Sequence, residues 1–309
     1  MQKNSLKYPV EFIDDIFGEN ETLAKAIGSG KVLIVADYNL IQRTPTLGTR
    51  IGAYLQRHGL ALAGSVVTSG GERIKLDNFQ SAGRIVQQAV SSGFGSGDTI
   101  LVIGGGSLLD VGGWVAAQLH GGVRLIRVPT TPAAMMGVAF ADSAMLSATT
   151  VKDVLRVPSQ PAAVLIDPVF AETVLDGVWR AGIGEAVRLL ADKDAKWLAR
   201  LKELSPAYAK RDKEAFREIL THVVGLRQKK GGTDLGVLAG AELEPKSGWK
   251  LPYGYAVSIG LLIELVRGVT LGTSKQATLD SCHEILKTCG ALDGLHHSKH
   301  ILPPEVANF

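Results

Sequence analysis

TILVIGGGSLLD, residues 99–110, joins a continuous apolar run to three glycines and the start of a helical pattern. Apolar runs of this length are typical of strands buried on both faces of a parallel sheet. Glycines at a strand-to-helix turn let backbone N–H groups approach a phosphate, and the helix N-terminus adds a partial positive charge. The stretch therefore predicts a phosphate-binding turn, or a turn in which glycine serves only to redirect the chain. It is not the GxGxxG fingerprint.

Three similar apolar runs flank this stretch: KVLIVAD (31–37), VRLIRVPTT (123–131) and PAAVLID (161–167). Helical patterns separate the runs at residues 46–59, 78–93 and 107–121. Alternating strands and helices indicate an α/β fold, a Rossmann-like doubly wound parallel sheet.

The pattern changes after Asp167. Four helical patterns follow, at residues 179–204, 213–230, 255–272 and 277–291, and no strand candidate of similar strength accompanies them. We therefore expect an α/β domain at residues 1–175 and an all-helical domain at residues 176–309.

The composition is that of an ordinary globular protein, with 309 residues, 46% of them hydrophobic and 20% charged. The net charge of +3 is spread along the chain without a basic stripe, so nucleic acid is not an expected partner. The N-terminus has no apolar signal-peptide region, and the longest apolar stretch (256–266) is too short to span a bilayer. We expect a cytoplasmic protein, with Cys282 and Cys289 as reduced thiols.

A family resemblance emerges from five motifs taken in order: GGERIK (70–75), IGGGSLLDVGGWVAA (103–117), GVRLIRVPTT (122–131), QPAAVLIDPVF (160–170) and WRAGIGEAVR (179–188). Their order and spacing resemble 3-dehydroquinate synthase and its sugar phosphate cyclase relatives. The resemblance is essentially gap-free from residue 70 to 190 and looser to about residue 270. It implies an α/β domain, a helical domain, NAD in the crevice between them, a small-molecule substrate and a homodimer.

The NAD-binding residues that the resemblance implies all lie in the first domain. Glu72 and Lys75 match an acid and a lysine that hold the NAD ribose, and Asp110 matches an acid near the nicotinamide. From the residues alone, a solvated helix residue is the alternative for Asp110. The full set is Asp37, Glu72, Lys75, Gly104, Gly105, Gly106, Ser107, Asp110, Thr130, Thr131, Phe170 and Thr173.

The metal site of the family has no counterpart in this sequence. The family holds a catalytic zinc with one glutamate and two histidines. Glu185 matches the glutamate, but Val237 and Tyr253 stand at the positions of the histidines. Catalytic zinc needs three protein ligands, so we expect no metal at this site. A relocated site at His296, His297 and His300 is the alternative, because their spacing suggests a cluster.

The substrate residues also depart from the family pattern. Gly137, Ser143 and Ser147 take the places of its aspartate, lysine and asparagine. Lys152 is retained, and Asp153 follows it where the family has asparagine. With these losses, we expect the chain not to make 3-dehydroquinate.

Three functions remain open. In a metal-free enzyme, Glu185 would be a general base if burial raised its pKa, Tyr253 or Tyr255 would donate a proton, and cationic side chains would grip an anionic group: Lys152, Arg188 and Arg227. The apolar segment PAAMMGVAF (132–140) would suit an apolar, natural-product-like substrate. Alternatively, the Glu185–Arg188 pair and the tyrosines have only structural roles, and the chain is a non-catalytic NAD-binding scaffold. A polyol or glycerol phosphate dehydrogenase is the third possibility.

Overall fold

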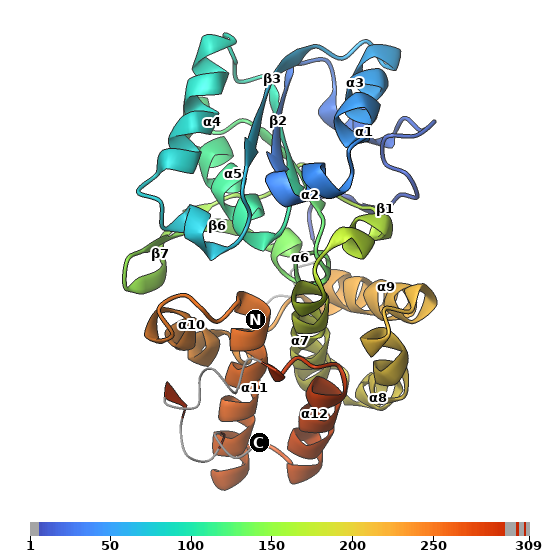
Figure 1. The fold of residues 1–309 in the computed structure, drawn as a ribbon, viewed down its shortest axis with the longest axis vertical. Coiled ribbons are helices and arrows are strands. Elements are labelled where there is room, and N and C mark those ends of the chain that lie inside the picture. The colour runs from blue at the N-terminus through green and yellow to red at the C-terminus, as the bar shows by residue number, and fades with distance from the viewer. Residues whose placement is uncertain (1–5, 294–300, 303–305, 307–309) are drawn as a thin grey trace. The chain divides into compact units, whose positions relative to one another are not determined.

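A computed structural model of the chain describes residues 6–293, 301–302 and 306 (Figure 1). The chain separates into two compact units. One contains Lys7–Thr149 and Asp153–Val174 and is called the α/β unit below. The other, called the helical unit, contains Leu6, Thr150–Lys152 and the chain from Leu175 onward. No helix in the described residues is long and apolar enough to cross a membrane.

The α/β unit is built on a six-stranded sheet in which every described pairing is parallel. Its four predicted strands are present, which confirms the Rossmann-like fold. The edge strands β1 and β3 were not predicted, because β1 is very short and β3 mixes polar with apolar residues. The strand order is β1 (Val10–Phe12), β8 (Ala163–Ile166), β5 (Arg124–Pro129), β4 (Thr99–Gly104), β2 (Val32–Asp37) and β3 (Leu62–Thr68).

The strand order reverses between β2 and β4. From β2 the chain moves outward to β3, whereas from β4 it moves in the opposite direction to β5, and Ala36 of β2 pairs with Ile103 of β4. In open parallel sheets, ligands bind at the carboxyl ends of the strands at such a reversal. Asp37 ends one of these strands and Gly104 ends the other.

Helices cover both sides of this sheet. Figure 1 shows α4 and α5 on one side of β2 and β3, and α1 and α3 on the other. The α-helices are α1 (Thr22–Ile27), α2 (Tyr38–Arg43), α3 (Leu47–Arg57), α4 (Gln80–Ser91), α5 (Gly106–Gln118) and α6 (Pro132–Met136). Short 3₁₀ turns include η1 (Glu72–Lys75), η3 (Val138–Phe140) and η4 (Pro168–Thr173).

A separate two-stranded sheet, β6 (Ser143–Ala148) and β7 (Val151–Pro158), lies in the segment after α6. Only two residues connect the strands, which requires a hairpin. The sequence did not predict this hairpin, because its strands are neither continuously apolar nor regularly alternating. Its strand β7 carries Lys152 and Asp153.

The described part of the helical unit contains six α-helices: α7 (Asp176–Lys193), α8 (Ala195–Ala209), α9 (Lys213–Lys230), α10 (Val237–Lys246), α11 (Tyr253–Thr270) and α12 (Gln276–Thr288). The prediction of one helical pattern over residues 179–204 was wrong, because the chain breaks at Asp194. Asp194 leaves helical geometry, with φ −153° and ψ 68°, and its carboxylate accepts a hydrogen bond from the Trp197 N–H at the start of α8. An aspartate at this position is a typical N-cap.

Helices α10 and α11 touch through their backbones. A Cβ added at Gly240 would lie 2.8 Å from the Ala256 carbonyl oxygen and 3.0 Å from the Val257 Cα. Glycine therefore allows an approach that no larger residue permits. This contact fixes α10, which carries Glu244, against α11, which begins at Tyr253.

We expect Gly240→Ala to lower the free energy of unfolding by about 1–3 kcal/mol, because the methyl group must push two backbones apart. Gly225→Ala is the matched control, since it also lies inside a helix but a Cβ there meets nothing within 4 Å. The control should stabilise the protein by about 0.5–1 kcal/mol through helix propensity. Urea denaturation of both variants measures the difference, and equal effects would contradict the backbone contact.

Candidate functional site

The glycine turn lies where the sequence predicted it, between a buried strand and a helix. β4 ends at Gly104, and α5, a helix of 13 residues, starts at Gly106. A Cβ at Gly104 would lie 2.6 Å from Leu108 Cδ2, and one at Gly105 would lie 3.2 Å from Thr131 Cγ2. The turn therefore needs glycine for its own packing, and the N-cap Gly105 and the first residue of α5, Gly106, have no side chain.

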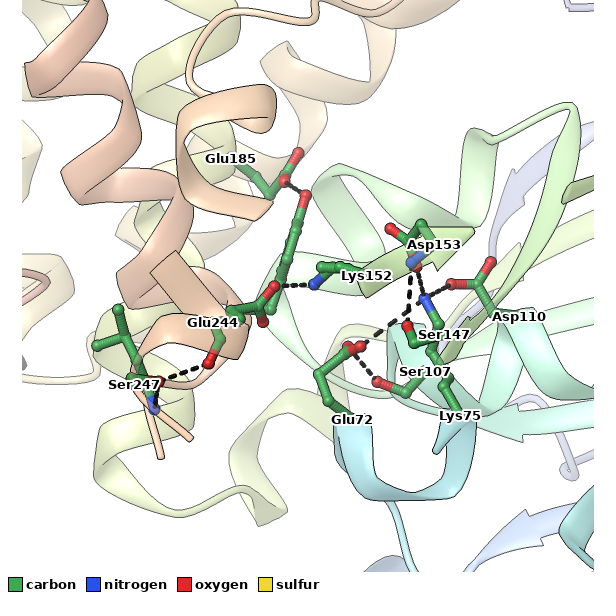
Figure 2. Close-up of polar contacts among 12 residues, drawn as sticks. Glu72, Lys75, Ser107, Asp110, Ser147, Lys152, Asp153, Glu185, Glu244 and Ser247 are labelled. Carbon is green, nitrogen blue, oxygen red and sulfur yellow. Dashed lines mark hydrogen bonds and ion pairs between the residues drawn. The ribbon is translucent and has the colours of Figure 1, made fainter. Parts of the chain in front are cut away.

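Lys75 is the centre of a buried polar cluster in the α/β unit. Its ammonium lies 2.9 Å from Asp110 Oδ2, forms a close ion pair with Asp153 and lies 3.7 Å from Glu72 Oε2 (Figure 2). The Ser107 hydroxyl donates a hydrogen bond of 2.6 Å to Glu72 Oε1. Four of the residues named from the resemblance thus lie together, and Asp110 is buried and paired rather than solvated.

This cluster holds more negative than positive charge. Burial opposes the charge of Lys75, but Asp110, Glu72 and Asp153 outweigh it and raise the pKa of Lys75 well above its ordinary value. Burial raises the pKa of Asp110, and Lys75 offsets only part of that rise. Three carboxylates therefore share one ammonium in a region with little water.

Arg127, which the sequence reasoning did not single out, is a second cation near Asp110. It is 1% exposed, and its guanidinium donates hydrogen bonds to the carbonyls of Ala139, Ala141 and Ser159. Burial lowers the pKa of Arg127, and Asp110 partly restores it. The available signal was an arginine inside the apolar strand sequence LIRVP.

Asp37 lies at the carboxyl end of β2, at the reversal of the strand order. Its carboxylate accepts a hydrogen bond of 2.7 Å from the Asn39 N–H and caps α2. Burial raises the pKa of Asp37, and these backbone hydrogen bonds offset part of the rise. Asp37 therefore has a local structural role in addition to the cofactor role implied by the resemblance.

The other residues named from the resemblance are in the same unit. The Thr130 N–H donates to the Gly104 carbonyl at 3.0 Å, which ties the loop after β5 to the glycine turn. Thr131 caps α6 with its side chain. Phe170 is buried, and the Thr173 hydroxyl donates to its carbonyl at 2.8 Å.

A second buried cluster, the Glu185 cluster, lies in the helical unit and consists of Glu185, Arg188, Arg227 and Tyr253. Glu185 Oε2 accepts hydrogen bonds from Arg188 at 2.8 Å and from Arg227 at 2.9 Å. Glu185 Oε1 accepts one from the Tyr253 hydroxyl at 2.7 Å. Glu185 and Arg188 come from α7, Arg227 comes from α9 and Tyr253 comes from α11. The Glu185 side chain is fully buried among them.

The electrostatics of this cluster do not favour a general base. Burial opposes ionisation, but the charges of Arg188 and Arg227 outweigh it and hold the pKa of Glu185 below its ordinary value. The condition for a general base, a pKa of Glu185 raised by burial, is therefore not met, because the two guanidinium groups outweigh burial. Burial and the neighbouring Glu185 raise the pKa of Tyr253 well above its ordinary value. Burial lowers the pKa of Arg227 to about 10.

Lys152 has a partner that the sequence did not reveal. It forms a close ion pair with Glu244 of α10, and both side chains are buried (Figure 2). The Lys152 ammonium also lies 4.6 Å above the centre of the Tyr253 ring. Glu244 was missed because it is 92 residues away from Lys152 and is one of two acids in α10.

Zinc does not fit the Glu185 cluster. Both carboxylate oxygens of Glu185 accept from donors of the protein, and the neighbours are two cations and a phenol. The described residues contain no group of three or more His, Cys, Asp or Glu placed to hold a metal ion. The alternative set of His296, His297 and His300 lies outside the described residues.

Comparison with known sequences agrees with the motifs. A family model described as 3-dehydroquinate synthase N-terminal matches residues 65–180. A 3-dehydroquinate synthase from Acidithiobacillus ferrooxidans is 25% identical over 297 residues, which cover 92% of this chain and 79% of that protein.

Solved structures show the same fold. A 2-epi-5-epi-valiolone synthase from Streptomyces hygroscopicus, solved with NAD⁺ and Zn²⁺, matches with a TM-score of 0.81 and 20% identity over 100% of this chain and 86% of that one. A 2-deoxy-scyllo-inosose synthase, solved with carbaglucose-6-phosphate, NAD⁺ and Co²⁺, matches with a TM-score of 0.76 and 16% identity over 94% of this chain and 84% of that one. The sequence motifs, the matching relatives and the shared fold agree: residues 65–180 match the 3-dehydroquinate synthase family, and the chain as a whole has the fold of the two synthases solved with NAD⁺.

Proposed function

We propose that this protein binds NAD in its α/β unit and works without a divalent metal, as a diverged enzyme of its family and not as a 3-dehydroquinate synthase. The observation that carries the proposal is that both carboxylate oxygens of Glu185 already accept hydrogen bonds from the protein. Its carboxylate, which matches the metal-binding glutamate of the family, is held by Arg188, Arg227 and Tyr253.

The residues of the α/β unit fit NAD. The glycine turn at Gly104–Gly106 begins α5, the reversal of the strand order lies beside it, and Lys75, Glu72 and Asp37 supply polar groups for hydroxyls. Bound NAD supplies hydride transfer to or from a substrate carbon. We propose that Glu72, Lys75, Ser107 and Asp110 bind the cofactor. We also propose that the boundary between the two domains lies between residues 175 and 176.

The Glu185 cluster replaces the charge of a metal site but not its coordination chemistry. Two guanidinium groups and one carboxylate give a net charge of +1, the same as a zinc dication with one glutamate and two neutral histidines. Such a cluster stabilises negative charge that develops on a substrate oxygen, without an open coordination position. A small alcohol with an anionic group is the substrate class that fits this charge.

A second candidate, a non-catalytic NAD-binding scaffold, has one specific observation in its favour. The Lys152 ammonium forms an ion pair with buried Glu244, and the Glu185 carboxylate forms an ion pair with Arg188. Groups that satisfy one another stabilise a fold without binding a substrate. The two candidates share the NAD site and differ only in whether any alcohol is oxidised.

Calorimetric titration of NAD⁺ into protein stripped of metal with chelator tests the shared part of the proposal. We expect micromolar binding that added Zn²⁺ does not change, and less than stoichiometric zinc in the purified protein by elemental analysis. Zinc that binds tightly and is required for NAD⁺ binding would refute metal independence.

A screen of anionic and apolar alcohols for NAD⁺ reduction separates the two candidates. In an enzyme, Tyr253→Phe should lower turnover at least tenfold and leave NAD⁺ affinity unchanged, because only the hydroxyl beside Glu185 is lost. Absence of turnover throughout the screen favours the scaffold. Light scattering tests the homodimer that the family resemblance implies.

A further inference from the structure

We propose that Asp153 is an internal competitor of NAD: its carboxylate occupies the Lys75 ammonium, and the cofactor must displace it to bind. The inference rests on the proposed NAD site at Lys75. It goes beyond that site because Asp153 would weaken cofactor binding rather than support it.

The first observation is the crowding of Lys75. Its ammonium donates hydrogen bonds to Asp110 and Asp153, and Glu72 Oε2 lies 3.7 Å away, within ion-pair distance but beyond a hydrogen bond. The Lys75 side chain is only 2% exposed, so little of the ammonium is open to a further partner. A ribose hydroxyl that accepts from Lys75 therefore competes with these carboxylates for it.

The second observation identifies Asp153 as the carboxylate that moves. Its side chain is 23% exposed, compared with 7% for Asp110 and 16% for Glu72. Asp110 sits inside α5 and also accepts from the Met145 N–H, while Glu72 accepts from Ser107. Asp153 has no such second anchor for its carboxylate among the hydrogen bonds of the described residues.

The backbone of Asp153 is also unusual. Its φ is +54°, in the left-handed region that costs energy for residues other than glycine and that aspartate and asparagine tolerate best. Its N–H donates to the Ser147 hydroxyl at 3.1 Å, which holds the backbone in place. The carboxylate therefore approaches Lys75 from a strained, separately anchored backbone.

The third observation is charge. Glu72, Asp110 and Asp153 carry three negative charges against Lys75 and the nearby Arg127. The pyrophosphate of NAD is itself anionic, so the Asp153 charge opposes it as well as holding Lys75. The family pattern has a neutral asparagine at this position, which neither pairs strongly with lysine nor repels phosphate.

Asp153→Asn tests the inference by calorimetric titration with NAD⁺. We expect the variant to bind NAD⁺ about tenfold more tightly than the wild type, because a charge-assisted competitor is removed while the left-handed backbone is still tolerated. Asp153→Gly should also bind NAD⁺ more tightly than the wild type, because it too removes the carboxylate. It provides a second test in case the asparagine variant does not fold.

Asp15→Asn is the matched control. Asp15 is also an aspartate of the α/β unit with positive φ, +56°, and it is ion-paired to Arg50, so the control removes the same kind of charge at another place. Unchanged affinity in both Asp153 variants would overturn the inference while leaving the proposed NAD site intact. Binding by the Asp153 variants but not by the wild type would support it. Failure of all variants to bind NAD⁺ would overturn both the inference and the proposed cofactor site.

Discussion

Replacing Glu185 by glutamine should lower the free energy of unfolding by about 3–5 kcal/mol at neutral pH, because it leaves two buried guanidinium groups without their carboxylate. Glu185 is fully buried, and Arg188 and Arg227 are each less than one-tenth exposed. Glutamine keeps the shape and some hydrogen bonds but none of the charge. Urea denaturation followed by tryptophan fluorescence is a suitable measurement, because Trp179, Trp197 and Trp249 report on the helical unit.

The effect of this substitution depends on pH in a defined direction. Arg188 and Arg227 hold the folded-state pKa of Glu185 below its unfolded value. Its stabilisation is therefore complete above the unfolded pKa of a glutamate, about 4.3, and is lost as the pH falls through the lower folded value. The difference between wild type and Glu185→Gln should be constant at pH 6–8 and shrink below about pH 4.

The double variant Glu185→Gln/Arg227→Met is the control for charge. It restores the net charge of +1 by removing one cation with the carboxylate, so it should recover much of the lost stability. Recovery would show that uncompensated charge, and not lost packing, causes the defect. A free energy of unfolding for Glu185→Gln within about 0.5 kcal/mol of the wild-type value would contradict the ion cluster described above.

Lys75→Met is the second large change. It leaves the carboxylates of Asp110, Asp153 and Glu72 without the ammonium they share, and we expect a loss of about 3–5 kcal/mol at neutral pH. The variant should also lose NAD⁺ binding, since the proposed ribose contact is gone. Denaturation at several pH values, together with calorimetry, measures both effects.

Acid should partly rescue this variant. Burial already raises the pKa of Asp110 in the wild type, and removing Lys75 removes the main opposing influence. A carboxyl with a raised folded pKa contributes stability below its unfolded pKa, about 3.9, and loses it as the pH rises through the folded value. The loss of unfolding free energy in Lys75→Met should therefore be smallest near pH 4. A loss that does not change with pH would contradict the sharing of one ammonium by three carboxylates.

Adding Asp153→Asn to Lys75→Met isolates the role of charge number. The double variant has one carboxylate fewer in the cluster, so it should be more stable than Lys75→Met alone at neutral pH. Adding Asp15→Asn to Lys75→Met should not raise the stability in this way, because Asp15 lies outside the cluster and pairs with Arg50.

Local patterns were enough to predict most of the sheet and the order of the helices. The buried strands β2, β4 and β8 are largely continuous apolar runs and β5 is one interrupted by Arg127, and a run of this kind is visible in any short window. The break at Asp194 was missed because the apolar period continues across it, although an aspartate before a tryptophan is a recognisable cap. The β6–β7 hairpin was missed because it is half exposed and lacks a regular alternation.

The clusters were harder to predict than the elements. Glu185 and Arg188 are three residues apart on one helix, so their contact followed from helical geometry. The contacts of Arg227 with Glu185 and of Glu244 with Lys152 join residues 42 and 92 positions apart. No local pattern specifies such pairs, and they decide whether a carboxylate is a base or a counter-ion.

The pairing of β1 has a consequence for the synthesis of the protein. β1 is made first, but its sheet partner is β8, through the pairing of Val10 with Val164, about 150 residues later in the chain. At translation rates of about 5–20 residues per second, the N-terminal segment waits roughly 10–30 s before its partner exists. During that interval β2, β3, β4 and β5 emerge in an order that lets them pair with one another. Of the six strands of this sheet, the one that is synthesised first is therefore expected to join last, and it closes an edge that would otherwise be open to a neighbouring chain.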